Sequence, residues 1–338
     1  MSKTRRHTKV VVCVATLALA ASACGSSSTP KSTPDVAPTA PQPSASTSSS
    51  PVPDPTRAPT PTRSAAKGSK DVGSGPSKVL VVIEENHSYA QTKQGMPFLA
   101  GLSDTYGYAT HWTALAHPSL PNYLGIAGGS AFGILDDRSP AAHTADIGSA
   151  TSVFDQAIAA GKTAGTYAES MPKNCHVYDS RDRAVGTPVY AVRHNPWLYF
   201  NSGRSDCEAN DRDTTSFAAD AARNGLPNVG FLIPNLLHDA HDASLSSADN
   251  WLKAQLTSVL DSSDFMSGRL VVVVTADEDD KHAGNTVLTS VLTPRIRHKV
   301  VSSPLTHYSL TRFLAQVMGV PPLRNGATAP DMASAFGL

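Results

Sequence analysis

The chain has 338 residues, of which 28 are basic and 28 acidic, so its formal net charge is zero. Nucleic-acid-binding proteins usually carry a basic excess gathered into a patch, and this balance argues against a nucleic-acid partner. The length would allow about two domains of roughly 150 residues each, but the first 75 residues do not have the composition of a folded core.

The N-terminal segment 1–23 has the pattern of an export signal. Four basic residues and no acidic residue precede or flank an apolar run from Val10 to Ala21. A run of this length is typical of a signal peptide and is shorter than the ~20 residues that a membrane-spanning helix needs. The small residues directly before Cys24 resemble a bacterial lipobox, which predicts a lipoprotein signal peptide and lipidation of Cys24. The alternative is ordinary cleavage nearby and release of a soluble protein.

Residues 24–75 are expected to form a disordered tether. In 25–75, Pro, Ser and Thr make up 29 of 51 residues, and no residue is aromatic. Such a segment cannot bury enough apolar surface to offset the entropy lost on ordering. The sequence therefore predicts an exported protein at the cell envelope, either anchored by lipid to the outer face of the cytoplasmic membrane or secreted. The remaining 263 residues, 76–338, hold 19 basic and 25 acidic residues, and the acidic excess is compatible with metal binding.

Residues 76–338 have the pattern of one α/β domain. Three apolar runs rich in β-branched residues read as strands buried on both faces: Val79–Ile83, Val229–Ile233 and Leu270–Val274. Helical patterns lie between and after them at Ser152–Ala160, Ser247–Leu260 and Tyr308–Met318. Alternating strands and helices predict a parallel sheet covered on both sides, and in such sheets the chemistry lies beyond the carboxyl ends of the strands.

Two cysteines remain in the expected folded domain. Because the protein is predicted to be exported, Cys175 and Cys207 are expected to form one disulfide that holds a polar insertion. A metal-binding thiol pair is the alternative, although the spacing matches no known zinc finger.

Oxygen ligands follow two of the predicted strands. Glu85 and Asn86 follow the first strand, and Asp277 and Glu278 begin a run of four acidic residues after the third. Each cluster alone is usually a solvated acidic loop. Because both lie at strand ends, we expect them to converge on one divalent cation of the kind that oxygen ligands bind, such as Ca, Mg, Mn or Fe.

A serine and several histidines lie in other loops of this kind. Ser119, in the motif His117-Pro118-Ser119-Leu120-Pro121-Asn122-Tyr123, is expected at a helix N-terminus, where the dipole favours an anion. Beside a cation its hydroxyl could act as a nucleophile, although a plain N-cap is the simpler interpretation. Asp239 and His241 follow the second strand, and His307 opens the last helix. A lone histidine is usually a surface or core residue. His241, next to Asp239 and Asp242, is better placed to be a metal ligand, a phosphate contact or a proton donor to the leaving group.

Taken together, these motifs resemble the bacterial phosphoesterase family, which contains acid phosphatases and phospholipases C of the phosphocholine type. The motifs occur in the family's order and span about residues 79–314. The resemblance implies an alkaline-phosphatase-like three-layer α/β sandwich with a mostly parallel sheet. It also implies that Glu85, Asn86, Ser119, Asp277 and Glu278 hold a divalent metal ion.

The resemblance further implies a two-step reaction on a phosphate ester. Ser119 attacks phosphorus to give a phosphoserine, and His241 or His307 protonates the leaving alcohol or binds phosphate. His117 and Asp239 are expected only to line the site. Three alternatives stay open: a phospholipase C-type phosphodiesterase, a serine esterase of Ser-His-Asp type, and a lipoprotein that binds a ligand without turnover. The sequence indicates no oligomeric state.

Overall fold

The computed structural model describes residues 75–181, 186 and 188–338. All of these belong to one compact unit, Gly68–Leu338. The expected signal peptide, Cys24 and all but the last residue of the expected tether lie outside the described residues. Among the described helices, none is both long enough and apolar enough to cross a membrane.

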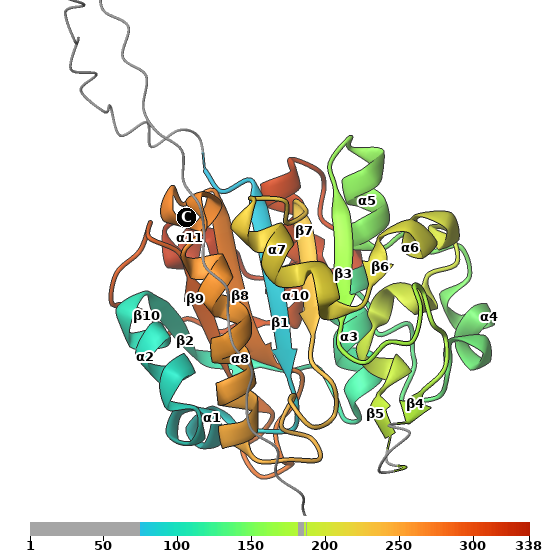
Figure 1. Ribbon diagram of the computed structural model, residues 1–338, viewed down its shortest axis with the longest axis horizontal. Coiled ribbons are helices and arrows are strands. Elements are labelled where there is room, and N and C mark those ends of the chain that lie inside the picture. Colours follow the sequence, from blue (N-terminus) through green and yellow to red (C-terminus); the bar gives the residue numbers. More distant parts are fainter. Residues whose placement is uncertain (1–74, 182–185, 187) are drawn as a thin grey trace, which may run out of the picture. The chain divides into compact units, whose positions relative to one another are not determined.

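A large, mostly parallel sheet forms the centre of this unit (Figure 1). Its strands run in the order β10-β2-β9-β8-β1-β7-β3-β6, and β11 pairs with β2. Their bounds are β1 Lys78–Glu84, β2 Gly107–Thr113, β3 Ala164–Ala168, β6 Asp211–Arg212, β7 Val229–Ile233, β8 Leu270–Ala276, β9 Thr286–Leu292, β10 Lys299–Val301 and β11 Leu305–Thr306. Within this described sheet, β9 runs antiparallel to both of its neighbours, and the other pairs are parallel.

Helices cover both faces of the sheet, which gives the three layers that the sequence predicted. One face packs against α3 Ser119–Gly128, α5 Val153–Ala159, α10 His307–Met318 and α11 Met332–Phe336. The other packs against α2 Pro97–Thr105, α7 Phe217–Ala222, α8 Leu245–Leu260 and α9 Ser263–Met266. Short helices α1 Tyr89–Gly95, α4 Thr144–Ile147 and α6 Arg204–Asn210 lie in the connections.

Shorter elements complete the described chain. A small two-stranded sheet pairs β4 Ser180–Arg181 with β5 Pro188–Tyr190. Single 3₁₀ turns are η1 Pro140–His143, η2 Val192–His194, η3 Pro196–Tyr199, η4 Thr214–Ser216 and η5 Arg324–Ala327.

The central strand β1 shows why this sequence forms a sandwich. Val79 and Val81 belong to the apolar cluster on one face, and Leu80 and Val82 belong to the cluster on the other. Successive side chains of a strand point to opposite faces, so a continuous apolar run is stable only when both faces are covered. This pattern in the sequence therefore places β1 at the centre of the sheet.

The predicted elements agree with the structure apart from their ends. The strand at Val229–Ile233 is confirmed with the same bounds, and the strand predicted from Leu270 continues to Ala276. Helix α8 begins at Leu245, two residues before the expected start, because the Ser244 side chain caps it by accepting from the Ser247 amide.

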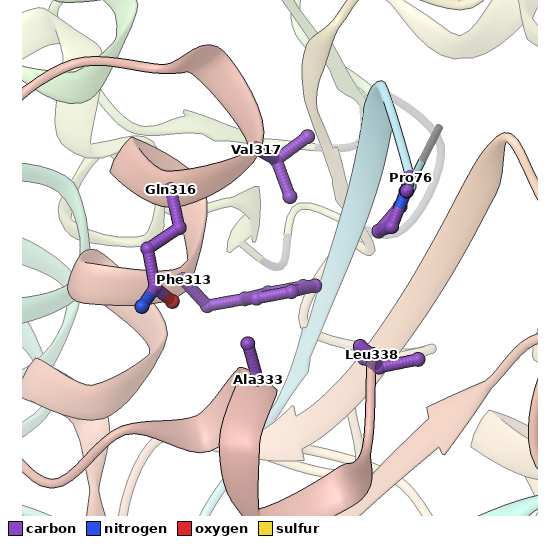
Figure 2. A pocket seen from close by; sticks show the side chains of 7 residues that line it. Pro76, Phe313, Gln316, Val317, Ala333 and Leu338 are labelled. Carbon is purple, nitrogen blue, oxygen red and sulfur yellow. The ribbon is translucent and has the colours of Figure 1, made fainter. Parts of the chain in front are cut away.

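A small apolar cavity of about 270 Å³ lies where the described chain enters the sheet (Figure 2). It is lined by Gly75, Pro76, Phe313, Gln316, Val317, Ala333 and Leu338. Because Pro76 precedes the amino end of β1, this cavity lies at the edge of the sheet opposite the polar loops that follow the carboxyl ends of the strands.

Candidate active site

Three neighbouring parallel strands deliver acidic side chains to one edge of the sheet. β8, β1 and β7 lie side by side, and Asp277, Glu85 and Asp239 come from the segments that follow their carboxyl ends. Backbone hydrogen bonds join these segments, because the Asp277 amide donates to the Glu84 carbonyl at 2.9 Å and the Glu85 amide to the Asp239 carbonyl at 2.7 Å. All three acidic residues are fully buried. The two acidic loops that the sequence placed at strand ends therefore do converge.

Ser119 points its hydroxyl at this cluster. It is the first residue of α3, and Pro118 rather than Ser119 is the N-cap, so the plain capping interpretation is wrong. The Ser119 Oγ donates to Glu85 Oε2 at 3.0 Å, and Tyr123, one turn further along α3, donates to Glu85 Oε1 at 2.6 Å. The helix thereby fixes a serine hydroxyl and a carboxylate at its own N-terminus, where the dipole favours negative charge.

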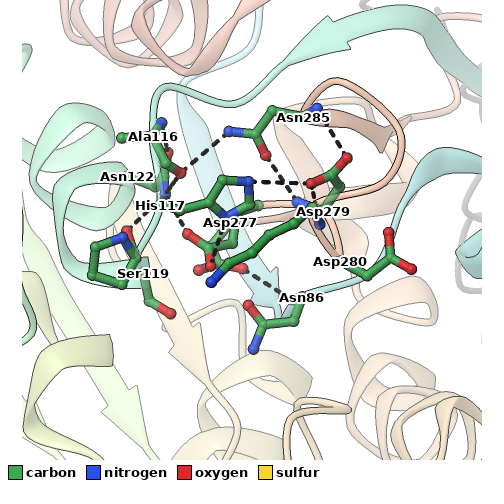
Figure 3. Close-up of polar contacts among 12 residues, drawn as sticks. Asn86, Ala116, His117, Ser119, Asn122, Asp277, Asp279, Asp280 and Asn285 are labelled. Atoms are coloured by element: carbon green, nitrogen blue, oxygen red, sulfur yellow. Dashed lines mark hydrogen bonds and ion pairs between the residues drawn. The ribbon is translucent and has the colours of Figure 1, made fainter. Parts of the chain in front are cut away.

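Asn86 and Asp277 are held together through the backbone. Asn86 has a positive φ of 51°, and its amide donates to Asp277 Oδ1 at 3.1 Å. This turn leaves the Asn86 side chain at the cleft that Ser119 also lines (Figure 3). The two residues of the first expected ligand pair therefore differ in exposure. Glu85 is buried, whereas the Asn86 side chain lines the cleft.

His307 contacts the back of the site and does not enter the cleft. Its Nε2 lies 2.6 Å from the Asp277 carbonyl oxygen, and its Nδ1 lies 3.1 Å from Trp112 Nε1. An indole N–H can only donate, so Nδ1 accepts and Nε2 donates. Burial lowers the pKa of His307 to about 4, which keeps the ring neutral. Because both ring nitrogens are occupied, the geometry does not support the expected role of His307 at the leaving group and indicates that it positions Asp277.

His117 contacts the acidic run that follows β8 (Figure 3). Its Nδ1 lies 2.9 Å from Glu278 Oε1, and its Nε2 lies 3.2 Å from Asp279 Oδ1. Asn122 on α3 donates to the other Glu278 oxygen at 3.2 Å. Asp279 is itself fixed by backbone amides of its own loop, those of Lys281, Ala283 and Asn285. His117 therefore orients Glu278. Among the described residues, no hydrogen bond joins His117 to Ser119.

Beside these buried side chains lies one cleft of about 290 Å³. It is lined by Asn86, Pro118, Ser119, Asp137, His241, Glu278, Asp279, Asp280 and Lys281. The cleft thus brings together the expected nucleophile, two of the expected metal ligands and His241, which come from four separate segments of the chain.

The acids of the cleft are short of positive charge. Burial, then Asp277 and Asp239, raise the pKa of Glu85 well above its usual value. Burial is also the largest cause that raises the pKa of Asp239 to about 7 and that of Glu278 to about 8. One oxygen of Asp277 and one of Asp239 are buried without a hydrogen-bond partner. Buried carboxylates of this kind are stable as anions only beside cations, so the donor set fits a divalent cation.

A compact group of metal-ligating residue types lies outside the cleft. Within the described residues, one group of three His, Cys, Asp or Glu side chains has ligand atoms that all lie within 4.8 Å of one another, namely Cys175, Cys207 and Asp211. Its two cysteines are bonded to each other as a disulfide, which removes the thiolates that a metal would need. The expected disulfide is therefore confirmed, and the thiol metal site is wrong.

The segment closed by this disulfide supplies two site residues that the sequence analysis missed. In η2, His194 Nε2 lies 3.1 Å from Glu85 Oε1 and its Nδ1 lies 3.3 Å from Asp239 Oδ2. These are close contacts and not hydrogen bonds, because His194 Nε2 and Asp239 Oδ2 both lack a hydrogen-bond partner. Its ring stacks on Tyr123 with centroids 5.1 Å apart. Arg193 lies beside it, with an Nη2 to His241 Nε2 distance of 3.3 Å. No motif marks these residues, because only the tertiary packing of the insertion brings them to the strand ends.

His241 is oriented by its neighbours in the loop after β7. Its Nδ1 lies 2.6 Å from Asp242 Oδ1, and its backbone amide donates to Asp239 Oδ1 at 2.8 Å. Because the Arg193 guanidinium can only donate, the Nε2 of His241 accepts and Nδ1 carries the hydrogen. The ring thus turns an acceptor nitrogen toward Arg193 at the cleft wall.

Comparison of the sequence with known proteins places this chain in a family. A phosphatidylinositol-3-phosphatase of Mycobacterium tuberculosis is 28% identical over 266 residues, which cover 77% of this chain and 82% of the relative. A phosphate-repressible acid phosphatase of Penicillium chrysogenum is 30% identical over 63% of this chain, which spans 52% of the relative's length. A solved structure of a protein in the alkaline phosphatase superfamily from Vibrio parahaemolyticus is 11% identical, with a TM-score of 0.47 over 74% of this chain and 68% of that one. The model of the Phosphoesterase family matches residues 88–321, well over half of the chain, and the chain therefore belongs to the phosphoesterase family.

Proposed function

We propose that this chain is a metal-dependent phosphatase that hydrolyses phosphate monoesters through Ser119. Membership of the phosphoesterase family gives the reaction class, the hydrolysis of phosphoric esters. The observation that carries the proposal is the Ser119 hydroxyl, which donates to Glu85 Oε2 at 3.0 Å in an acid-lined cleft at the N-terminus of α3. The names of the two relatives, both phosphatases, favour monoesters over diesters.

The first step forms a bond between Ser119 Oγ and phosphorus and breaks the bond between phosphorus and the leaving oxygen. Glu85 Oε2 is the acceptor nearest to the Ser119 proton, and burial raises the pKa of Glu85. The hydrogen bond from Ser119 places this carboxylate where it can take the hydroxyl proton. The positive end of the α3 dipole then faces the charge that develops on the oxygen.

The leaving alcohol receives its proton from His241 in this proposal. Asp242 holds the Nδ1–H side of the ring. Nε2 accepts from Arg193 in the structure, so it leaves that contact and takes up a proton from solvent before it donates to the leaving oxygen at the cleft. In the second step water attacks the phosphoserine, gives a proton back to His241 Nε2 and releases inorganic phosphate. Ser119 recovers its hydroxyl hydrogen from Glu85, so both steps balance.

Glu85, Asn86, Ser119, Asp277 and Glu278 are the residues that we propose hold the divalent cation. When bound, such a cation lowers the pKa of a coordinated hydroxyl and offsets the charge on the phosphoryl oxygens. The orphaned oxygen of Asp277 and the raised pKa of Glu278, to about 8 without a cation, support this set.

The alternatives from the sequence find less support. A serine esterase needs a histidine beside its serine, and Ser119 donates to a glutamate instead. A lipoprotein that only binds its ligand does not account for a serine hydroxyl held against a buried carboxylate. A phosphodiesterase differs in substrate alone, so the first experiment must separate it from a phosphatase.

The full chain is assayed on p-nitrophenyl phosphate and p-nitrophenylphosphorylcholine, with and without EDTA. We expect turnover of the monoester that EDTA abolishes and that added Ca, Mg, Mn or Fe restores. Preference for the choline diester would assign a phospholipase C-type activity, and full activity in EDTA would refute the metal. Silence on both esters with every metal present would contradict the proposed function.

We further propose that the protein is exported and anchored at the cell envelope through Cys24. The basic N-terminus, the apolar run and the small residues before Cys24 support this proposal. In the native cell, Cys24→Ser is expected to move the protein from the membrane fraction to the soluble fraction, whereas the matched control Cys13→Ser leaves it in place. A mature N-terminus with an unmodified Cys24 in mass spectrometry would contradict the anchor.

A further inference from the structure

Arg193 occupies a position that the mechanism above does not use. It lies in η2, within the segment that the Cys175–Cys207 disulfide closes, and its side chain is 18% exposed. Its guanidinium reaches two residues that line the cleft from different segments. Nη2 lies 3.3 Å from His241 Nε2, and Nε lies 3.9 Å from Asp137 Oδ2.

These contacts give the positive charge of Arg193 no close negative partner among the described residues. A separation of 3.9 Å is too long for a hydrogen bond, so the carboxylate of Asp137 does not form the two-pronged pair that arginine prefers. His241 accepts a hydrogen bond but carries no negative charge in that state. Arg193 is mostly buried and has no closer anionic partner among the described residues, and such an arginine can bind an anion that arrives in the cleft.

The electric field of Arg193 reaches the acids of the site. Its charge lowers the pKa values of Glu85, Asp239 and Glu278, against the larger effect of burial. The guanidinium is therefore near the acids that surround Ser119, and it contacts the cleft through two of its lining residues, His241 and Asp137. Lys281 also lines the cleft, but an ammonium cannot bridge two oxygens in one plane as a guanidinium can.

We propose that Arg193 binds two non-bridging oxygens of the phosphoryl group and thereby makes the site selective for monoesters over diesters. A monoester at neutral pH has three non-bridging oxygens that share two negative charges, whereas a diester has two that share one. A planar guanidinium gains most from the dianion, because both of its prongs find a charged acceptor. The inference rests on the proposed function and adds the residue that selects the substrate class.

Binding of the phosphoryl group by Arg193 also affects His241. When Arg193 donates to phosphoryl oxygens, it no longer donates to His241 Nε2. That nitrogen is then free to take up a proton from solvent and to face the leaving oxygen. Phosphate binding by Arg193 is therefore linked to the ability of His241 to act as the acid, because the same guanidinium serves both.

A merely structural role for Arg193 predicts something different. If the side chain only ties η2 to the loop after β7, its loss lowers the stability of the protein and affects every substrate equally. A binding role predicts a higher KM for the monoester together with weaker inhibition by phosphate. A structural role predicts a lower melting temperature and equal losses on both substrates.

The test compares Arg193→Gln and Arg193→Lys with wild type in the full chain. The matched control is Arg138→Gln, since Arg138 is exposed and pairs with Asp136, one residue from Asp137. We measure kcat and KM for p-nitrophenyl phosphate and for bis-p-nitrophenyl phosphate, the inhibition constant of inorganic phosphate, and the melting temperature. Calorimetric titration with inorganic phosphate reports binding without turnover.

We expect Arg193→Gln to lower kcat/KM for the monoester and to weaken phosphate binding by about 10- to 100-fold, mainly through KM. The diester should lose less than about threefold, and Arg193→Lys should lie between Arg193→Gln and wild type because it keeps the charge without the fork. Equal losses on both esters, or phosphate binding that is unchanged in Arg193→Gln at an unchanged melting temperature, would overturn the inference. If wild type hydrolyses neither ester, the proposed function fails, while calorimetry still decides whether Arg193 binds phosphate.

Discussion

Ser119 and Glu85 form the central pair of the cleft, and the side chains around them hold Glu85 from several sides. Tyr123 donates to Oε1 and Ser119 to Oε2, so both carboxylate oxygens accept a hydrogen bond from α3. Fixing a carboxylate in this way costs conformational entropy once, on folding, and not again in each turnover. The position of the Ser119 hydroxyl is therefore set before a substrate arrives.

His117 provides a prediction at this scale, because it contacts Glu278 and Asp279 but not Ser119. His117→Gln is expected to raise the metal concentration that half-restores activity after EDTA treatment by about 10- to 100-fold, as outer partners of metal ligands typically do. The kcat at saturating metal should change by less than about threefold. Metal titrations of p-nitrophenyl phosphate turnover measure both quantities. The exposed His111→Gln serves as control, and a collapse of kcat at an unchanged metal requirement would mean that His117 takes part in the chemistry.

The residues of the site differ in how readily the sequence reveals them. Glu85, Asn86 and Asp277 follow buried apolar strands directly, so the strand pattern alone predicts that they gather at one edge of the sheet. Ser119 is identifiable from its place in a motif at the start of a helix. Arg193 and His194 follow no strand of the main sheet, and their place depends on how the insertion folds back over α3.

At the scale of elements, the insertion between β3 and β7 is the part that the disulfide stabilises. The bond joins Cys175 to Cys207 across 32 residues of sequence, and η2 with Arg193 and His194 lies between them. A loop of this length gains from a crosslink mainly because the crosslink restricts the unfolded chain. The insertion can therefore hold polar site residues without a large apolar core of its own.

The double variant Cys175→Ser, Cys207→Ser is predicted to lose about 3 kcal/mol of unfolding free energy. Its kcat/KM for p-nitrophenyl phosphate should also fall, because Arg193 and His194 are held less firmly. Urea denaturation followed by tryptophan fluorescence measures the stability, and Trp197 lies within the segment. A reductant should affect wild type and leave the double variant unchanged. Equal stability of the two proteins would show that the insertion does not need the bond.

Asp211 at the start of β6 ties the same insertion to the sheet and gives a prediction on pH. It is fully buried and accepts from Asn195 Nδ2 at 2.9 Å and from the Thr166 hydroxyl. Burial raises its pKa from the ordinary 3.8 to about 6. Below pH ~4 both the folded and the unfolded chain hold this proton, so burial of Asp211 does not lower the free energy of unfolding. As the pH rises toward 6, the unfolded chain releases the proton first, and the stability of the folded state falls.

Asp211→Asn removes this titration and keeps the shape of the side chain. Relative to wild type, the variant should gain about 3 kcal/mol of unfolding free energy between pH ~4 and pH ~7. Urea denaturation at a series of pH values gives the difference directly. A difference that stays constant over this range would mean that Asp211 is ionised in the folded protein at low pH as well.

At the scale of the whole molecule, strand order explains why distant segments meet. β1 is first in the sequence, yet it lies between β8 and β7, so residues about 190 positions apart share one edge, as Asn86 and Asp277 do. The α/β class and the buried strands were predictable, because a continuous apolar run admits few other structures. The antiparallel strand β9 and the way the insertion packs were not, because both depend on contacts between segments far apart in the sequence.

The central claim is that Ser119 is the nucleophile of a phosphatase, and the most direct measurement is the turnover of Ser119→Ala on p-nitrophenyl phosphate with metal present. The full chain of wild type and of the exposed-serine control Ser149→Ala are measured in parallel, and circular dichroism confirms that each variant is folded. The account predicts that Ser119→Ala loses at least about 10³-fold in kcat, while Ser149→Ala stays within about twofold of wild type. A folded Ser119→Ala protein that keeps a tenth of wild-type turnover or more would contradict the account, because the ester would then be attacked by another group.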